Sequence, residues 1–462
     1  MRGSLARFST VVAAVLLCAS CAGVRQRERM AAAAPAFPDV RFAVFSDVHL
    51  YDVSLGTEGK AFRSYIAGDR KLLVESEEIL RSAIQTVKDL RVTFLLVSGD
   101  LTKDGERKDH ELCVRYLDTL KDSGISVYVV PGNHDILNPR ALGYSEPGSR
   151  RVPNVTPEEF AELYCDFGYG GALLRDPDSL SYVAEPVPGL WLLALDSCDY
   201  RQNPGRSEPA TDGSFSRKTL EWTEGVLARA ARDQVPVIAM MHHGVIEHFK
   251  GQAKHYAQYL VNDRQEVASL LAAWRVPVVF TGHFHAQDIA MEKWNDGGTL
   301  YDVETGSLVT DPNPVRAVEI TARRMTIHSS FITELPSFAA DGRDFGRYSR
   351  AFLREGIRGI AKRSLAKAWV PAQEAETLAG EISEAFAAHF EGDERFTGTE
   401  KLKRKGLSFM GSLAVATQGD FVEGLWDDLE PPDNDVVIDL STGAWQAVKE
   451  QHGGFRLSFL PR

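Results

Sequence analysis

Short apolar runs alternate with longer amphipathic stretches over residues 40 to 332. The apolar runs predict buried strands, and apolar residues at helical spacing predict helices that cover a sheet. The predicted strands span 40–45, 92–97, 127–130, 190–195, 235–241 and 276–281. The predicted helices span about 70–90, 107–121, 156–167, 217–232 and 263–274, and the alternating stretch 315–332 predicts a β-hairpin. This alternation indicates a layered α/β core.

The pattern changes after about residue 334. Helical periodicity covers 347–369 and 372–390, and the apolar run 436–440 predicts one strand. The 462 residues are also more than one ordinary domain contains. We therefore expect a large domain at 39–334 and a smaller, mostly helical accessory unit at 335–462.

Polar side chains that can bind metals follow five of the predicted strands. They form five clusters: Asp47 and His49; Asp100; Asn133, His134 and Asp135; His242 and His243; and His283 and His285. The carboxyl ends of strands in an open α/β sheet meet at one edge, where such proteins usually place their chemistry. Carboxylate, amide and imidazole groups without a thiolate suit divalent first-row metals. One cluster alone would indicate little, because a single buried histidine is more often structural, but five in order predict a two-metal site.

The ordered motifs resemble those of the calcineurin-like metallophosphoesterase superfamily over residues 40 to 330. They are Asp47-x-His49, Gly99-Asp100, Gly132-Asn133-His134-Asp135, His242 and Gly282-His283-x-His285. The resemblance implies two facing mixed sheets flanked by helices, an αββα sandwich. It also implies phosphate ester hydrolysis by a hydroxide that two divalent ions activate, with manganese, iron or zinc as the candidate metals.

The resemblance also assigns the ligands. Asp47, His49 and His285 would hold the first metal, Asn133, His242 and His283 the second, and Asp100 would bridge the two. His134 matches the superfamily's histidine that binds no metal, contacts the phosphate and assists the leaving group. The superfamily pattern places the ligand at the first histidine of such a pair, and alternation along a strand points neighbouring side chains in opposite directions. We therefore assign His242 to the metal and expect His243 to orient a ligand or touch substrate.

Two sequence differences exclude subfamilies of the superfamily. Purple acid phosphatases have tyrosine three residues after the bridging aspartate, where this chain has Lys103. Serine/threonine protein phosphatases continue as Gly-Asp-x-Val-Asp-Arg-Gly, whereas this chain reads Gly-Asp-Leu-Thr from Gly99 to Thr102. That form is nearer to the small-molecule phosphodiesterases, so we expect a small phosphodiester as substrate.

Candidate substrate-binding residues lie on segments expected to overhang the site. The stretch 138–153 is rich in Pro, Gly and Arg and predicts a long loop. Besides His243, the basic and aromatic candidates near ligands are Arg140, Tyr144, His248 and Lys250. Residues of these types are usually only solvated, so each is a hypothesis.

The N-terminus predicts export. Arg2 and Arg7 precede a short apolar stretch at about 8–19, which is typical of a signal peptide and too short to span a bilayer comfortably. Small residues before Cys21 resemble a bacterial lipoprotein signal, so we expect a signal peptide at 1–20, lipidation of Cys21 and a tether at 21–38. An ordinary secretory signal cleaved nearby is the alternative.

The amino-acid composition limits the classes of binding partner that we expect. The net charge of −12 argues against a general nucleic-acid binder, which needs cations to neutralise phosphates. The basic run from Lys401 to Lys405 is expected to be a solvated helix end, and Cys113 a core residue of the helix 107–121. The alternatives left open are a catalytically silent metal-binding lipoprotein of this fold and a nuclease.

Overall fold

The computed structural model describes residues 35–295, 297–398 and 401–448. The predicted signal peptide, Cys21 and most of the tether lie outside these residues. Within the described part, no helix combines the length and hydropathy needed to cross a bilayer.

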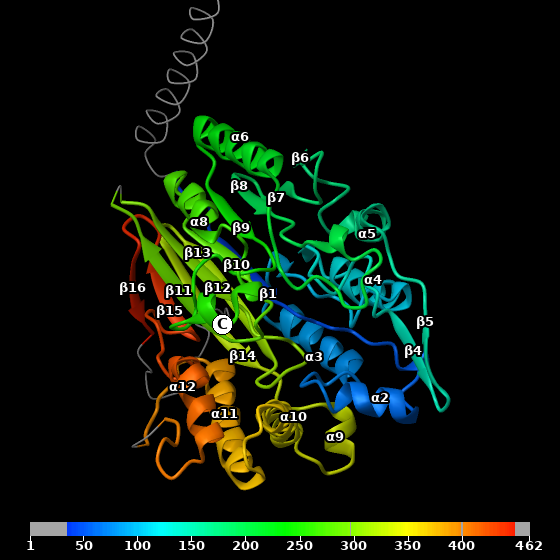
Figure 1. Cartoon of the computed structure of the whole chain (residues 1–462). Coiled ribbons are helices and arrows are strands. Elements are labelled where there is room, and N and C mark those ends of the chain that lie inside the picture. Colours follow the sequence, from blue (N-terminus) through cyan, green and yellow to red (C-terminus); the bar gives the residue numbers. More distant parts are fainter. Residues whose placement is uncertain (1–34, 296, 399–400, 449–462) are drawn as a thin grey trace, which may run out of the picture.

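Two seven-stranded sheets face each other and form the core (Figure 1). The first sheet has the order β16-β15-β14-β13-β1-β2-β3 and the second β11-β12-β10-β9-β8-β7-β6. The first sheet contains β1 (Val40–Phe45), β2 (Phe94–Val97), β3 (Ser126–Val129), β13 (Pro314–Thr321), β14 (Arg324–Phe331), β15 (Asp435–Asp439) and β16 (Ala444–Ala447). The second contains β6 (Leu174–Arg175), β7 (Tyr182–Val187), β8 (Leu190–Ala194), β9 (Val237–Met240), β10 (Val278–Thr281), β11 (Asp288–Lys293) and β12 (Thr299–Glu304).

The inner faces of the two sheets pack directly on one another. Phe42 of β1 stacks on Phe94 of β2 at 4.6 Å between ring centroids and meets Phe280 of β10 edge-on at 5.5 Å. All three rings are fully buried, which accounts for the continuous apolar runs in the sequence. The fold is therefore the expected αββα sandwich.

Helices cover the outer face of each sheet. The apolar stripes of α3 and α4 join the core cluster of the first sheet, and those of α6 and α8 join a cluster with β8, β9 and β10. The helices are α2 (Gly59–Ile66), α3 (Ser76–Asp89), α4 (Arg107–Lys121), α5 (Pro157–Leu163), α6 (Arg217–Asp233), α7 (Gln252–His255), α8 (Arg264–Ala273), α9 (Pro336–Ala340), α10 (Phe345–Lys367), α11 (Ala372–Glu391) and α12 (Phe409–Gly424). Cys113 is buried in α4, as predicted.

The C-terminal region is not a separate unit, and this corrects the predicted boundary at 334/335. β15 pairs antiparallel with β14, with Ile438 opposite Met325, and β16 extends the same sheet. Val436 and Ile438 are fully buried in the core of the first sheet. Only α9 to α12 form the expected helical layer, and the pattern analysis missed α12, which contains three glycines.

Two further segments differ from expectation. Residues 138–153 contain a β-hairpin, β4 (Leu142–Ser145) and β5 (Gly148–Arg151), which contacts α2 instead of forming an open loop. The Lys401–Lys405 run precedes α12 and is not helical. Its lysine and arginine side chains contact acidic residues: Lys401 pairs with Asp427, and Arg404 pairs with Glu423.

Candidate metal centre

The five predicted clusters meet at one end of the sandwich. The parallel strands β1, β2 and β3 end just before Asp47, Asp100 and Asn133. The parallel strands β9 and β10 end just before His242 and His283. Because parallel strands share the edge at which they end, the two facing sheets direct these loops toward one point.

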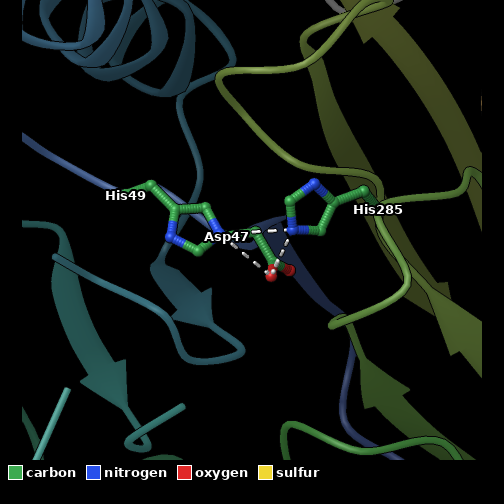
Figure 2. Close-up of side chains that lie close together, drawn as sticks. All are labelled: Asp47, His49 and His285. Atoms are coloured by element: carbon green, nitrogen blue, oxygen red, sulfur yellow. Dashed lines mark hydrogen bonds and ion pairs between the residues drawn. The ribbon is translucent and has the colours of Figure 1, made fainter. Parts of the chain in front are cut away.

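Asp47, His49 and His285 form the first group (Figure 2). Nε2 of His285 lies 3.3 Å and Nε2 of His49 lies 3.7 Å from Oδ1 of Asp47. The two Nε2 atoms are 3.2 Å apart. Oδ1 of Asp47 is buried and has no hydrogen-bond partner among the described residues, which fits an oxygen that binds a cation.

Asp100, His242 and His283 form the second group, and Asn133 lies beside it. Nε2 of His242 is 3.4 Å from Oδ2 of Asp100 and 3.3 Å from Oδ1 of Asn133. Nδ1 of His242 lies 2.8 Å from the carbonyl oxygen of Ser98, which fixes the ring and leaves Nε2 for the site. Oδ2 of Asp100 is also 3.6 Å from Nε2 of His49, so this carboxylate lies between the two groups.

Strained backbone holds these side chains in place. Five of the candidate ligands have positive φ angles: Asp47 (50°), His49 (39°), Asp100 (49°), His283 (81°) and His285 (73°). Such angles are unfavourable for residues with a Cβ and concentrate at functional sites. The motif glycines permit the close approach of the loops, because a Cβ on Gly132 would lie 2.0 Å from Oδ1 of Asp100.

The electrostatics suit divalent cations. Burial opposes ionisation of Asp47, yet the imidazoles of His285 and His49 hold its pKa well below the usual value. Burial lowers the pKa of His49 to about 3, so its imidazole is neutral, as a metal ligand must be. Burial lowers the pKa of His242, but Asp100 outweighs it and raises that pKa to about 9, so metal binding at this group would displace a proton from the ring. Two neighbouring groups of imidazoles and carboxylates fit two divalent ions bridged by Asp100.

His134 lies at this site and is held by an aspartate that the sequence analysis missed. Nδ1 of His134 is 2.8 Å from Oδ1 of Asp104, and Asp104 also pairs with the buried Lys103. Burial lowers the pKa of His134, but Asp100 and Asp104 outweigh it, so the net shift is upward. The spacing Gly-Asp-x-x-x-Asp in a loop was the available signal, but only the fold shows that Asp104 turns back to His134.

His243 packs beside the second metal group, with its ring 4.5 Å from that of His283, but both of its ring nitrogens have other partners. Its Nδ1 lies 2.8 Å from Oγ of Ser197, and its Nε2 lies 2.9 Å from the carbonyl oxygen of Thr211. With both ring nitrogens occupied, His243 has no nitrogen left for a metal. It instead holds the Thr211 segment, which lines the cavity beside the metal groups.

Asp135 connects two loops of the site through hydrogen bonds to their backbone. Its carboxylate accepts hydrogen bonds from the backbone amides of Leu101, Thr102 and Gly132. It therefore joins the Asp100 loop to the Asn133 loop and is not available as a ligand.

A cavity of about 310 Å³ opens over the candidate ligands. Asp100, Asn133, His134, His283 and His285 form its floor, and its walls include Asp69, Arg70, Lys71, Glu208, Thr211 and Tyr259. Pattern analysis missed Arg70, Lys71 and Tyr259, because basic and aromatic residues in loops are common and only the fold brings these to the site.

Of the four loop candidates for substrate binding, only Arg140 lies near this cavity. Nη1 of Arg140 is 2.8 Å from Oε1 of Glu208, a residue of the cavity wall. Tyr144 is buried against Phe62 in the packing of the β4–β5 hairpin on α2. Lys250 does not line the cavity; its backbone carbonyl lies close to Gly424 of α12.

His248 is buried elsewhere, among carboxylates, so the prediction that it contacts substrate is not supported by its position. Its Nδ1 lies 2.7 Å from Oδ1 of Asp288, and its Nε2 lies 3.5 Å from Oδ2 of Asp302. Burial lowers the pKa of His248, but the neighbouring carboxylates raise it well above its usual value. The residue joins β11 and β12 to the segment that follows β9.

Comparison with solved structures finds matches at low sequence identity and low TM-score. A dimetal phosphatase from Danio rerio is 18% identical, with a TM-score of 0.45 over 64% of this chain and 97% of that one. An NAD nucleotidase from Haemophilus influenzae is 12% identical, with a TM-score of 0.32 over 64% of this chain and 49% of that one. No curated protein matches the chain. Residues 40–287, more than half of the chain, match the sequence model of the calcineurin-like phosphoesterases. The chain therefore belongs to the calcineurin-like phosphoesterase family, whose members hydrolyse phosphoric ester bonds.

Proposed function

We propose that the protein is an exported, two-metal phosphoesterase that hydrolyses small-molecule phosphodiesters. Family membership supports phosphoester hydrolysis, and the two ligand groups that share Asp100 support a dinuclear centre of manganese, iron or zinc. The N-terminal sequence supports export and attachment to a membrane through a lipid on Cys21.

The side chains of the site divide the work of hydrolysis. Two divalent ions, when bound, would lower the pKa of a water molecule and would stabilise the negative charge on the phosphoryl oxygens. His134, whose pKa Asp100 and Asp104 raise despite burial, donates a proton or hydrogen bond to the departing oxygen. Asp104 acts as a positioning residue, because its contact with Nδ1 leaves Nε2 of His134 for the substrate.

The cavity wall favours a substrate of low charge. Lys71 lies 3.4 Å from Asp69, and Arg140 is paired with Glu208, so these cations face carboxylates of the same wall. A diester carries one negative charge and a terminal monoester up to two, so the diester suits this wall better. The cavity of about 310 Å³ also favours a small reacting group over a polymer.

The observation that carries the proposal is the convergence of both ligand groups and His134 on this one cavity. The test is hydrolysis of matched phosphomonoesters, phosphodiesters, cyclic nucleotides and pyrophosphates by the purified protein with added manganese. We expect metal-dependent turnover that is highest for diesters. A protein that binds two metals and turns over none of these substrates would instead be the catalytically silent metal-binding lipoprotein.

A nuclease remains the other enzyme class to test. Its groove would need a basic face with stacking aromatic residues, and the net charge of −12 offers little support for one. Single-stranded and double-stranded DNA and RNA in the same screen separate the two. Cleavage of polymers faster than of small diesters would overturn the small-molecule proposal.

A further inference from the structure

A second and larger cavity lies beside the metal centre. Its volume is about 650 Å³, and α10, α11 and α12 form most of its wall. The wall is mainly apolar and includes Ile357, Ile360, Leu378, Ile382, Phe386 and Val415. Mostly apolar cavities of 300–1,000 Å³ are typical of small-molecule sites. The lining of this cavity contains none of the candidate metal ligands, so metal binding does not account for it.

The metal motif itself separates the two cavities. His283 and His285 face the metal groups, whereas the ring of Phe284 between them lines the apolar cavity. The ring of Tyr259 lies 4.6 Å from that of His283 and 4.9 Å from that of Phe284. Tyr259 lines both cavities. The apolar cavity is thus one side chain away from a candidate metal ligand.

Arg70 marks the same junction. It also lines both cavities, and its guanidinium carbon lies 5.5 Å from the centroid of Phe390. Nε of Arg70 is buried and has no hydrogen-bond partner among the described residues. A buried donor without a partner is costly, and an anionic oxygen at the junction would satisfy it.

The apolar cavity opens to solvent, because its lining includes the exposed residues Ala368 and Thr417. Ala368 and Ala414 line the cavity, and their chain neighbours Trp369 and Leu413 are 82% and 44% exposed. The cavity thus runs from the metal centre to a mouth with apolar side chains beside it.

We propose that the apolar cavity binds the hydrocarbon chain of the substrate, so that the enzyme acts on phosphate esters of long-chain alcohols. This inference rests on the proposed function and names its substrate class. The phosphate lies over the metal ligands, Arg70 contacts an anionic oxygen at the junction, and the chain passes Tyr259 into the space between the helices. A water-soluble short-chain ester would leave the larger cavity unused.

The first test is a series of alkyl 4-nitrophenyl phosphodiesters with methyl, butyl, octyl and dodecyl chains. All are used below the concentration at which they aggregate, so that chain length is the only variable. Burial of each methylene is expected to raise kcat/KM by roughly threefold to fourfold until the cavity is filled. The leaving group is the same throughout, so the gain is expected mainly as a lower KM.

The second test measures binding without turnover. Alkylphosphonates of the same chain lengths are titrated into the metal-loaded protein by calorimetry. Affinity is expected to rise with chain length, with an increasingly negative heat-capacity change that marks apolar burial. Ala414→Phe, which fills part of the cavity, is expected to flatten the dependence of affinity and of kcat/KM on chain length.

The matched control is Ala416→Phe, which adds the same ring at an exposed position of α12 that does not line the cavity. It is expected to retain the wild-type dependence on chain length. Hydrolysis of the methyl ester with no gain from longer chains would overturn this inference and leave the proposed function standing. Failure to hydrolyse any ester in the presence of metal would overturn the proposed function. Loss of the chain-length dependence in both variants would also contradict the inference, since the effect would not come from the cavity.

Discussion

At the scale of single residues, the site combines buried polar groups with strained backbone, both of which lower stability unless cations bind there. Asp47, Asp100 and four of the histidines are buried in two neighbouring groups, and Oδ1 of Asp47 has no hydrogen-bond partner in the part of the chain that the structure describes. Several of these residues also have left-handed backbone. Buried carboxylates and strained backbone are retained where the surrounding structure over-determines them, which is usual at functional sites.

Replacement of His134 by Ala tests its assignment as the group that assists the leaving oxygen. Positioned acids typically contribute ~10²–10⁴-fold to rate, and this help matters most for a poor leaving group. We expect His134→Ala to slow an alkyl phosphodiester with an alkoxide leaving group far more than a nitrophenyl ester. Metal content, measured by elemental analysis, is expected to stay unchanged. Equal slowing of both esters would place His134 on the phosphoryl group, and loss of metal would make it a ligand.

Asp100→Asn tests the bridge. Oδ2 of Asp100 lies 3.6 Å from Nε2 of His49 and 3.4 Å from Nε2 of His242, so the carboxylate serves both ligand groups. The amide is neutral and weakens both sites. We expect loss of at least one metal and of nearly all turnover, with the fold retained by circular dichroism. Two retained metals with normal activity would contradict the bridging role.

At the scale of elements, the C-terminal segment completes the first sheet. β15 covers the edge of β14, and its inward residues Val436 and Ile438 are fully buried. An exposed β14 edge would offer unpaired backbone groups to other chains. The strand thus ties the helical layer to the phosphoesterase core, and neither part is expected to fold well without the other.

Ile438→Ala tests how much the packing of β15 contributes to the stability of the whole protein. Removal of a buried isoleucine side chain typically costs about 2–5 kcal/mol in the free energy of unfolding. We expect a loss in this range for the whole protein in urea unfolding. Val437→Ala on the same strand is the matched control, because its side chain is only half-buried, and it is expected to cost clearly less. A separate unfolding transition in Ile438→Ala, with the main one unchanged, would show that the C-terminal region is an independent unit.

Asp428→Asn tests the charge balance where the C-terminal segment meets the second sheet. Partial burial and the nearby carboxylates of Glu394, Asp288 and Asp393 raise the pKa of Asp428 to about 7, although the residue is still exposed to solvent. The folded-state pKa lies above the unfolded value, so this group costs stability as pH rises from about 4 to 7. We therefore expect Asp428→Asn to raise the melting temperature at pH 8 and to leave it nearly unchanged at pH 4. Equal shifts at both pH values would rule out this cause.

At the scale of the whole molecule, location and substrate are linked. A lipid on Cys21 would hold the enzyme at a membrane, where esters of long-chain alcohols are found. The prediction is that Cys21→Ser moves the protein from the membrane fraction to the soluble exported fraction, measured by fractionation and immunoblotting. Cys18→Ser is the matched control and is expected to remain with the membrane. A wild-type protein that is already soluble and begins at another residue would contradict lipidation.

The sequence by itself determined the alternation of strands and helices in a layered α/β core and the five strand-end clusters, whereas the two-sheet sandwich was expected from the resemblance to the superfamily. Those features are local, because a buried strand must be apolar along its length and a metal site needs hard donors directly after it. The helix 107–121 and the hairpin 315–332 agree with α4, β13 and β14 for the same reason.

Only the tertiary structure decided how distant segments meet. It assigned both ring nitrogens of His243 to Ser197 and Thr211, and it placed Asp104 behind His134. It buried His248 among carboxylates and added β15 to a sheet whose other long strands end by residue 331. It also set Arg70 and Tyr259 between the metal centre and the apolar cavity. These facts depend on contacts between residues far apart in the chain, which hydrophobic periodicity does not encode.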